Sequence, residues 1–417
     1  MIQKHGVERG SSTIRSILAG LSLLGLLGQA ADGQEQAKPP LRIGVLTDLM
    51  SIYSDNSGIG SVTAAQMAVE DFGGSVLGRR VEVISADHQN KTDVGATLAR
   101  KWLDIDNVSV IVDVPNSAIA LTVQELTRQK GKVFLATGAA TSRLTGDACS
   151  PTGIHWTYDT YAVSHGTAGA MTRQGGKKWF FITANYAFGT QLEADSQKVI
   201  AVEDGKSLGS VRHPVNTSDF SSYLLQAQAS GANVIGLANA GNDFIQTVKQ
   251  ASEFGLDKAG LRLVGLLVFI ADIHGLGLPI AQGLVLSSAF YWDLDADSRA
   301  WSKRFITRVQ KVPTMIHAGT YGAVMHYLKA IQAAGTDDGA TVARKMRETP
   351  VNDFMTKNGI IREDGRLVRD MYLFEVKKPS ESKGQYDYYK LLATIPGEQA
   401  FKRLEDGGCP LVAKKSQ

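Results

Sequence analysis

The sequence has little of what metal-dependent or thiol-dependent enzymes use. Its 417 residues include two cysteines and eight histidines, and no two histidines are three or four positions apart. Zinc sites need histidine or cysteine ligands at short spacings, so no metal site is expected. The glycine-containing stretch 57–63 lacks the third glycine of a dinucleotide fingerprint, where Thr63 stands. We therefore expect neither a bound metal nor an organic cofactor.

No catalytic centre can be recognised either. The G-x-S-x-G match at 205–209 follows a predicted helix and precedes a predicted strand, whereas a nucleophile elbow needs the opposite order. No carboxylate pair accompanies a nucleophile at a strand end, and the acidic residues found there have the positions of caps and turns. We predict that the protein is not an enzyme, with an exported hydrolase as the alternative.

Long apolar runs are absent except near the N-terminus. Residues 17–27 form an apolar run, which is shorter than the about 20 residues of a transmembrane helix. Three basic residues precede this run and Gly28-Gln29-Ala30 follows it, a pattern typical of a secretory signal peptide. No cysteine follows the run, which argues against a lipoprotein anchor. We predict a signal peptide over 1–30 and export to the periplasm, with an N-terminal membrane anchor as the alternative.

Charge of one sign is not in large excess. The 44 Lys and Arg residues against 41 Asp and Glu residues give a net charge of +3, so no nucleic-acid or membrane-surface partner is expected. In an exported protein an even number of cysteines predicts a disulfide, here between Cys149 and Cys409, with two free thiols as the alternative. This disulfide would hold the C-terminal tail, residues 397–417, against the rest of the chain.

From residue 41 onward, predicted strands alternate with predicted helices. Apolar runs rich in Val, Ile and Leu, separated by amphipathic segments, are typical of parallel sheets covered by helices on both faces. The fold class that we predict is α/β, with two Rossmann-like lobes, each built on a mostly parallel sheet. Lobe 1 comprises 41–158 plus 292–365, and lobe 2 comprises 159–291 plus 366–396. The strands are predicted at 41–49, 79–87, 108–115, 132–138, 177–185, 207–215, 232–241, 262–269, 283–290, 371–376 and 386–395.

The loops after the strands contain the candidate binding residues, because ligands of open α/β sheets bind beyond the carboxyl ends of the strands. At one such end, LATGAATSRL (135–144) has small residues followed by Thr141 and Ser142, which suits an anion bound by backbone N–H groups. Other loops are rich in aromatic rings, as a mostly apolar pocket requires, although core packing is the alternative for any single ring. These rings are Tyr53, Tyr158, Tyr161, Tyr186, Phe188, Phe269, Phe290, Tyr291 and Trp292.

Six segments taken together resemble one known family. In chain order they are IGVLTDL, AAQMAVEDFGG, VIVDVPNSAIAL, FLATGAATSRLT, NYAFGT and VIGLANAG. They resemble the solute-binding proteins of ABC transporters of the leucine/isoleucine/valine-binding type, over the whole chain after the predicted signal peptide. The resemblance implies a type I periplasmic-binding fold, in which three hinge crossovers join the two lobes. It also implies a small-molecule ligand in the cleft between the lobes, a membrane permease as partner, and a monomer.

The resemblance further implies which residues contact the ligand. In the family, the loops that match 115–118 and 138–142 hold a carboxylate of the ligand, here through Asn116, Ser117, Ala139 and Thr141. The other expected contacts lie in the remaining loops at the cleft. They are Tyr53, Asp55, Tyr161, Tyr186, Phe188, Asn239, Leu267, Phe269 and Tyr291.

One departure from the family concerns the class of ligand. Amino-acid binders hold the ligand's ammonium with an acidic residue in the loop that matches 265–269, where this sequence has Leu266-Leu267-Val268. A buried ammonium without a charged partner is costly, so an α-amino acid should bind poorly. The family's Tyr-Gly after the first strand of the second lobe appears as Phe188-Gly189, with Tyr186 two residues earlier, and in this the sequence resembles the branch that binds aromatic carboxylates. The resemblance implies a small aromatic carboxylate of the benzoate or phenylpropanoid type. The alternatives are a branched-chain amino acid or an amide, with Asp159 or Asp243 as the missing acid, and a ligand-binding sensor.

Overall fold

The computed structural model describes residues 38–256 and 260–412, so the predicted signal peptide lies outside the described residues. The first sheet has six strands in the order β2-β3-β1-β4-β5-β6. All are parallel except β2, which runs antiparallel to β3. The strands are β1 (Leu41–Thr47), β2 (Ser75–Val76), β3 (Arg79–Asp87), β4 (Val108–Asp113), β5 (Val133–Ala136) and β6 (Gly153–His155).

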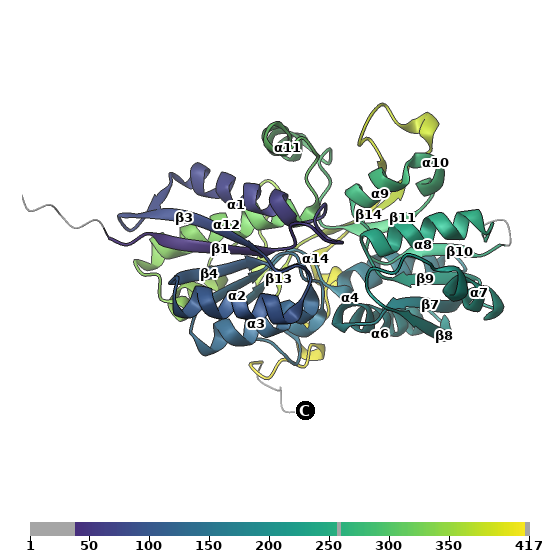
Figure 1. Cartoon of the computed structure of the whole chain (residues 1–417), viewed down its shortest axis with the longest axis horizontal. Helices are drawn as coiled ribbons and strands as arrows, with labels where there is room; N and C mark the ends of the chain where they lie inside the picture. Colours follow the sequence, from purple (N-terminus) through teal and green to yellow (C-terminus); the bar gives the residue numbers. More distant parts are fainter. Residues whose placement is uncertain (1–37, 257–259, 413–417) are drawn as a thin grey trace, which may run out of the picture. The chain divides into compact units, whose positions relative to one another are not determined.

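Helices cover both faces of this sheet (Figure 1). Helices α2 and α3 pack on one face, whereas α1, α12 and α13 pack on the other, with α11 against α1. Residues of β1 and β4 are buried on both faces, which explains why these strands are continuous apolar runs. The helices are α1 (Gly58–Phe72), α2 (Thr92–Asp104), α3 (Ser117–Gln129), α11 (Ala296–Val309), α12 (Met315–Ala334) and α13 (Gly339–Glu348).

The second sheet has four parallel strands in the order β10-β9-β7-β8. These strands are β7 (Lys178–Ala184), β8 (Lys206–His213), β9 (Val234–Ala238) and β10 (Arg262–Gly265). Its helices are α4 (Thr160–Val163), α5 (Gly169–Arg173), α6 (Ala187–Val202), α7 (Ser221–Ala229), α8 (Asn242–Glu253), α9 (Ile270–Leu276) and α10 (Leu278–Ala281), with the π-helical turn η2 (Ser164–Ala168) joining α4 to α5. The prediction of two mostly parallel sheets with helices on both faces is confirmed.

A third sheet is antiparallel, which the alternation of strands and helices did not predict. It consists of β11 (Val285–Ser288), β14 (Met371–Val376) and β15 (Tyr389–Ile395), and β11 contacts β10 of the second sheet. Two short strands, β12 (Ile360–Ile361) and β13 (Leu367–Val368), pair with each other. The short helices not yet named are η1 (Ser142–Thr145), η3 (Pro379–Glu381), α14 (Gly397–Ala400) and η4 (Leu404–Asp406).

The chain passes from the first lobe to the second after β6, returns after β11, and passes again after β13, as expected for three crossovers. The lobe boundaries given above remain predictions. The predicted strand 262–269 is too long, because β10 ends at Gly265 and the segment 266–269 forms a loop before α9. The side chain of Asp272 accepts the N–H of Phe269 at 2.9 Å and so fixes the start of that helix.

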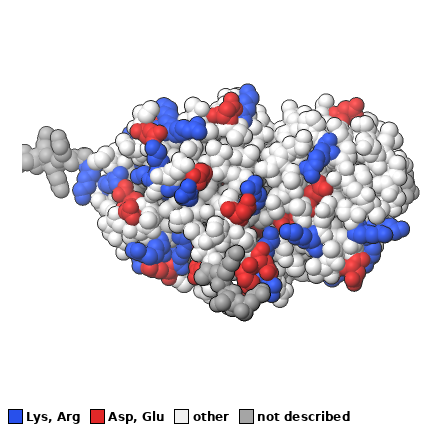
Figure 2. Space-filling model, turned by 90° about the horizontal axis from the view of Figure 1, so that it is seen from below, with Lys and Arg blue, Asp and Glu red and all other residues white. Residues whose placement is uncertain are grey.

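The predicted disulfide between Cys149 and Cys409 is present, with the two Cα atoms 5.7 Å apart. It ties the segment after η4 to the loop before β6, so the C-terminal segment is held against the first lobe. On the face that Figure 2 shows, Lys and Arg side chains are interspersed with Asp and Glu side chains. Within the described residues, no helix combines the length and the apolar character needed to cross a membrane.

Candidate functional site

A small cavity lies where the two parallel sheets face each other with their carboxyl ends. Most of its lining residues come from loops after strands of both sheets, and Phe188 and Ile316 come from the first turns of α6 and α12. The lining contains no Lys, Arg, His, Asp or Glu side chain. The lining residues are Tyr53, Asn56, Pro115, Gly138, Ala140, Tyr158, Tyr186, Phe188, Ala240, Leu267, Phe269 and Ile316.

Aromatic side chains form much of the cavity wall. The hydroxyl oxygens of Tyr53 and Tyr186 are 2.6 Å apart, so this pair joins a loop of the first lobe to a loop of the second. The ring of Tyr158 meets Phe269 edge-on at 6.2 Å, and Tyr186 lies 5.8 Å from Phe188. Burial raises the pKa of the Tyr53, Tyr158 and Tyr186 hydroxyls, so all three are neutral at physiological pH.

The loop after β5 borders the cavity through Gly138 and Ala140. The carbonyl groups of residues 138–140 each accept a hydrogen bond from another part of the protein. The Gly138 carbonyl accepts the hydroxyl of Tyr158, the Ala139 carbonyl accepts Nε2 of His155, and the Ala140 carbonyl accepts the N–H of Thr160, each at 2.7 Å. All three partners belong to the segment in which the chain first passes between the lobes. This anchoring fixes how the loop presents its N–H groups.

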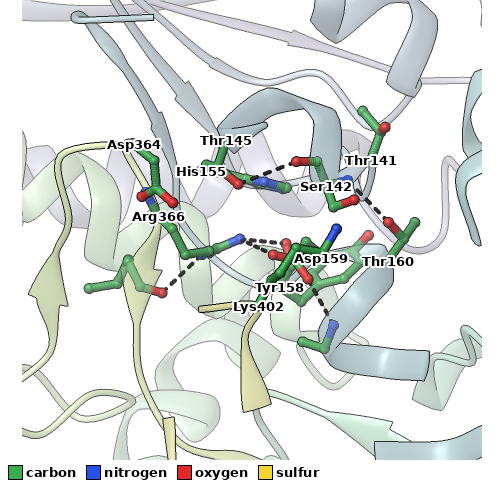
Figure 3. Close-up of polar contacts among 12 residues, drawn as sticks. Thr141, Ser142, Thr145, His155, Tyr158, Asp159, Thr160, Asp364, Arg366 and Lys402 are labelled. Carbon is green, nitrogen blue, oxygen red and sulfur yellow. Dashed lines mark hydrogen bonds and ion pairs between the residues drawn. The ribbon is translucent and has the colours of Figure 1, made fainter. Parts of the chain in front are cut away.

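Two N–H groups in that loop are free. Those of Ala139 and Ala140 donate to no group among the described residues, although both residues are buried. Beside them, the N–H of Thr141 donates to Oγ of Ser117 at 3.3 Å, and Oγ1 of Thr141 is buried without a partner. Figure 3 shows Thr141 next to Ser142 and the crossover residue Thr160. Unpaired buried donors of this kind are the groups that an anion would satisfy.

Close backbone packing explains the small residues. A Cβ atom at Gly138 would lie 2.5 Å from Oδ1 of Asp113 and 2.9 Å from Cα of Pro115, so only glycine fits. Just before Pro115, the non-glycine residues Asp113 and Val114 have φ angles of 82° and 57°. A β-branched residue with positive φ is strained, and such strain is concentrated at functional sites.

The Asp113 carboxylate positions the loops rather than lining the cavity. It accepts the hydroxyl of Ser57 at 2.5 Å and that of Thr137 at 3.5 Å, so it joins the loops after β1 and β5. Complete burial raises its pKa to about 6, an effect that the hydroxyl hydrogen bonds oppose.

Six helices begin at or just beside lining residues: α1, α3, α6, α8, α9 and α12. The N-terminus of a helix has free N–H groups and a partial positive charge. Because the lining has no cationic side chain, backbone N–H groups and these N-termini are the groups available to an anion in the cavity.

Asp272 on α9 contacts the cavity wall, and the sequence reasoning missed this residue. Its Oδ1 accepts Nδ2 of the lining residue Asn56 at 3.2 Å, across the two lobes. Burial raises the pKa of Asp272 to about 7. The two acids considered earlier are engaged elsewhere. Asp159 caps α4 and lies 3.6 Å from Arg366, and Asp243 accepts the N–H groups of residues 216 and 217.

The structure brings together eight of the thirteen predicted site residues. Five of them line the cavity and three form the adjoining wall, whereas the other five lie away from it. The lining residues are Tyr53, Tyr186, Phe188, Leu267 and Phe269, and the adjoining residues are Ser117, Ala139 and Thr141. That these eight contact a ligand remains a prediction.

The other five predicted residues do not line the cavity, and each of their side chains has a different environment. Asp55 is exposed and pairs with Lys311 at 2.6 Å. Asn116 caps α3 and donates to Asn90. Tyr161 stacks on His165, Asn239 donates to His213 and Thr247, and the Tyr291 hydroxyl donates to the carbonyl of Tyr386.

Several lining residues were not predicted as contacts. Asn56, Pro115, Gly138, Ala140 and Ala240 lie one or two positions from predicted residues, in the same loops. Tyr158 was recognised as a candidate ring but not as a contact. Ile316 has no local signal, because it reaches the cavity from α12, 47 positions after Phe269, the last of the other lining residues.

Comparisons with known proteins agree with this geometry. The family model described as periplasmic binding protein matches residues 40–385. A periplasmic binding protein from Burkholderia mallei is 48% identical, with a TM-score of 0.88, over 89% of this chain and 99% of that one. A branched-chain amino acid ABC transporter periplasmic ligand-binding protein from Burkholderia xenovorans is 41% identical, with a TM-score of 0.80 and the same coverage.

A more distant structure shares the fold. The solute-binding protein of an ABC transporter from R. palustris, solved in complex with benzoate, is 18% identical with a TM-score of 0.78 and covers 89% of this chain and 100% of that one. The family match extends over both sheets and all the loops that line the cavity. The chain therefore belongs to the periplasmic binding protein family and is a solute-binding protein of the ABC transporter type.

Proposed function

We propose that the protein binds a small aromatic carboxylate in the cavity between its lobes and delivers it to the permease of an ABC importer in the periplasm. The observation that supports this most directly is the pairing of an aromatic lining with two free N–H groups, those of Ala139 and Ala140. The ring would pack against the tyrosine and phenylalanine side chains. The carboxylate would accept hydrogen bonds from the loop after β5.

The energetics of this arrangement are adequate for transport. A hydrogen bond to a charged group contributes about 1.5–3 kcal/mol, and micromolar affinity corresponds to about −8 kcal/mol. Two such bonds, the helix N-termini and a buried ring supply this after the ordering costs of binding. The contacts Tyr53–Tyr186 and Asn56–Asp272 span the lobes, which is the arrangement expected of a form closed over its ligand.

A branched-chain amino acid is the second candidate, since the 41% identical relative has that class of ligand in its name. It would need a carboxylate for the ligand's ammonium. No acidic side chain lines the cavity, and Asp272, which contacts the lining residue Asn56, already accepts two hydrogen bonds. The benzoate complex of the R. palustris protein, at 18% identity, is compatible with the aromatic proposal but supports only the fold.

Calorimetric titration of protein stripped of ligand by unfolding and refolding separates the candidates. We expect saturable binding at micromolar concentration with benzoate-type or cinnamate-type acids and no heat with leucine. Tight binding of leucine would replace the proposal by the second candidate. Absence of binding to every aromatic acid tested would overturn the proposed ligand class.

A further inference from the structure

Asn56 has a buried amide oxygen with no hydrogen-bond partner. The residue is 2% exposed, lines the cavity, and its Oδ1 is unpartnered among the described residues. Its backbone is fixed, because its N–H donates to the carbonyl of Tyr53 at 3.0 Å and its carbonyl accepts the hydroxyl of Thr314 at 2.7 Å. A buried acceptor left unpaired is destabilising, so a ligand group that donates a hydrogen bond to this oxygen would be favoured.

Asp272 determines which end of the Asn56 amide is free. Oδ1 of Asp272 accepts Nδ2 of Asn56 at 3.2 Å, and Oδ2 accepts the N–H of Phe269 at 2.9 Å. An ionised carboxylate can only accept hydrogen bonds, so it selects the NH₂ end of the amide. The amide oxygen is thereby turned away from Asp272 and left for another donor.

A second acceptor lies in the same wall. The hydroxyl of Tyr158 donates its only hydrogen to the carbonyl of Gly138, so the hydroxyl oxygen can still accept a hydrogen bond. The cavity wall and the loop beside it therefore offer two kinds of polar group. The N–H groups of Ala139 and Ala140 suit a carboxylate, whereas Oδ1 of Asn56 and Oη of Tyr158 suit a hydrogen-bond donor.

We propose that the ligand has a hydroxyl group in addition to its carboxylate, and that Oδ1 of Asn56 accepts the hydrogen bond of this hydroxyl. The proposal rests on the proposed function, since it refines the aromatic acid to a hydroxylated one. An ammonium would also donate, but its charge would face a lining without carboxylates. Asp272 acts as a positioning residue that sets the orientation of the amide.

Titrations at pH 8 with benzoate, its three hydroxy isomers and the matching methoxybenzoates test this proposal. We expect at least one hydroxybenzoate to bind about tenfold more tightly than both benzoate and its own methyl ether. The methyl ether keeps the oxygen and removes the donor. In Asn56→Leu, the hydroxybenzoate is expected to bind no more tightly than benzoate or the methyl ether. Asn185→Leu, at an exposed position, is the matched control and should leave the preference unchanged.

Asp272→Asn gives a readout that a purely structural role would not produce. In this variant, the side-chain amide oxygen at position 272 would still accept the N–H of Phe269, and the NH₂ group of the same amide would face Asn56. The Asn56 amide should then turn over and present NH₂ to the cavity. We expect the preference to shift from the hydroxybenzoate toward its methyl ether.

The outcomes are distinct. Binding of aromatic acids without any preference for a hydroxyl, or a preference that survives Asn56→Leu, would overturn this inference and leave the proposed function in place. Such a result would mean that water satisfies the amide oxygen. Failure of every aromatic acid to bind would overturn the inference together with the proposed function.

Discussion

At the loop after β5, the distribution of used and free hydrogen-bonding groups determines what the protein can bind. The carbonyl groups of Gly138, Ala139 and Ala140 are all taken by one segment, residues 155–160, and the free N–H groups follow from that anchoring. The small side chains are required by close backbone packing, as the 2.5 Å distance from a Cβ at Gly138 to Asp113 shows. The amino-acid composition indicates that this loop consists of small residues. It does not indicate which N–H groups of the loop are free.

At the same scale, Asp272 should make stability depend on pH. Its folded pKa of about 7 lies above the ordinary value of 3.8, so its stabilising contribution is present below pH 4 and lost as the pH rises through 7. Asp272→Asn should therefore gain stability relative to wild type, by up to about 4 kcal/mol, between pH 4 and pH 8. Urea denaturation of both proteins at the two pH values measures this. A stability difference between the two proteins that does not change with pH would contradict the raised pKa of Asp272.

Single residues could be predicted only where a local pattern exists. Leu267 and Phe269 were chosen because they stand at the carboxyl end of a predicted strand, and both line the cavity. In the turn after β1, the sequence reasoning chose Asp55, but its neighbour Asn56 is the residue that lines the cavity. The conformation of the turn determines which of the two side chains points inward. The contact between Asn56 and Asp272 joins residues 216 positions apart, and no periodicity in the sequence reports such a pair.

At the scale of elements, the crossovers hold the two lobes together through Arg366. This side chain is fully buried, with Nη1 donating to the carbonyl of Tyr158 at 2.9 Å and Nε donating to that of Leu367 at 3.0 Å. It lies 3.6 Å from Oδ2 of Asp159 and stacks on the ring of Phe401, 4.6 Å from the centroid. Figure 3 shows Arg366 reaching Tyr158 and Asp159. The first and third crossovers are thereby linked to the C-terminal segment.

Arg366→Met should destabilise the protein by about 3–5 kcal/mol, because it leaves the buried carboxylate of Asp159 without its partner. Burial lowers the pKa of Arg366 to about 10 despite Asp159, so the pair is already costly to bury. The double variant Arg366→Met/Asp159→Asn keeps the cap of α4 and should recover part of the loss. Urea denaturation measures both effects. A loss below about 1 kcal/mol in Arg366→Met would show that the pair is not needed for stability.

At the scale of the whole molecule, the sequence predicts the architecture better than the site. Alternation of apolar and amphipathic segments is local, and it correctly predicted two parallel sheets with helices on both faces. Strand direction is not local, so the antiparallel sheet of β11, β14 and β15 was not foreseen. The disulfide could be predicted because only two cysteines exist, so one pairing was possible. Ile316 reaches the cavity only through the return of α12 to the first lobe.

The central claim is that the N–H groups of Ala139 and Ala140 bind the carboxylate of an aromatic acid. A crystal structure of the complex with the tightest-binding acid from the titrations tests it most directly. The account predicts a carboxylate oxygen within about 3.2 Å of both nitrogen atoms, with the ring between the aromatic side chains of the two lobes. A carboxylate bound elsewhere, with these two N–H groups facing water or another part of the ligand, would contradict it.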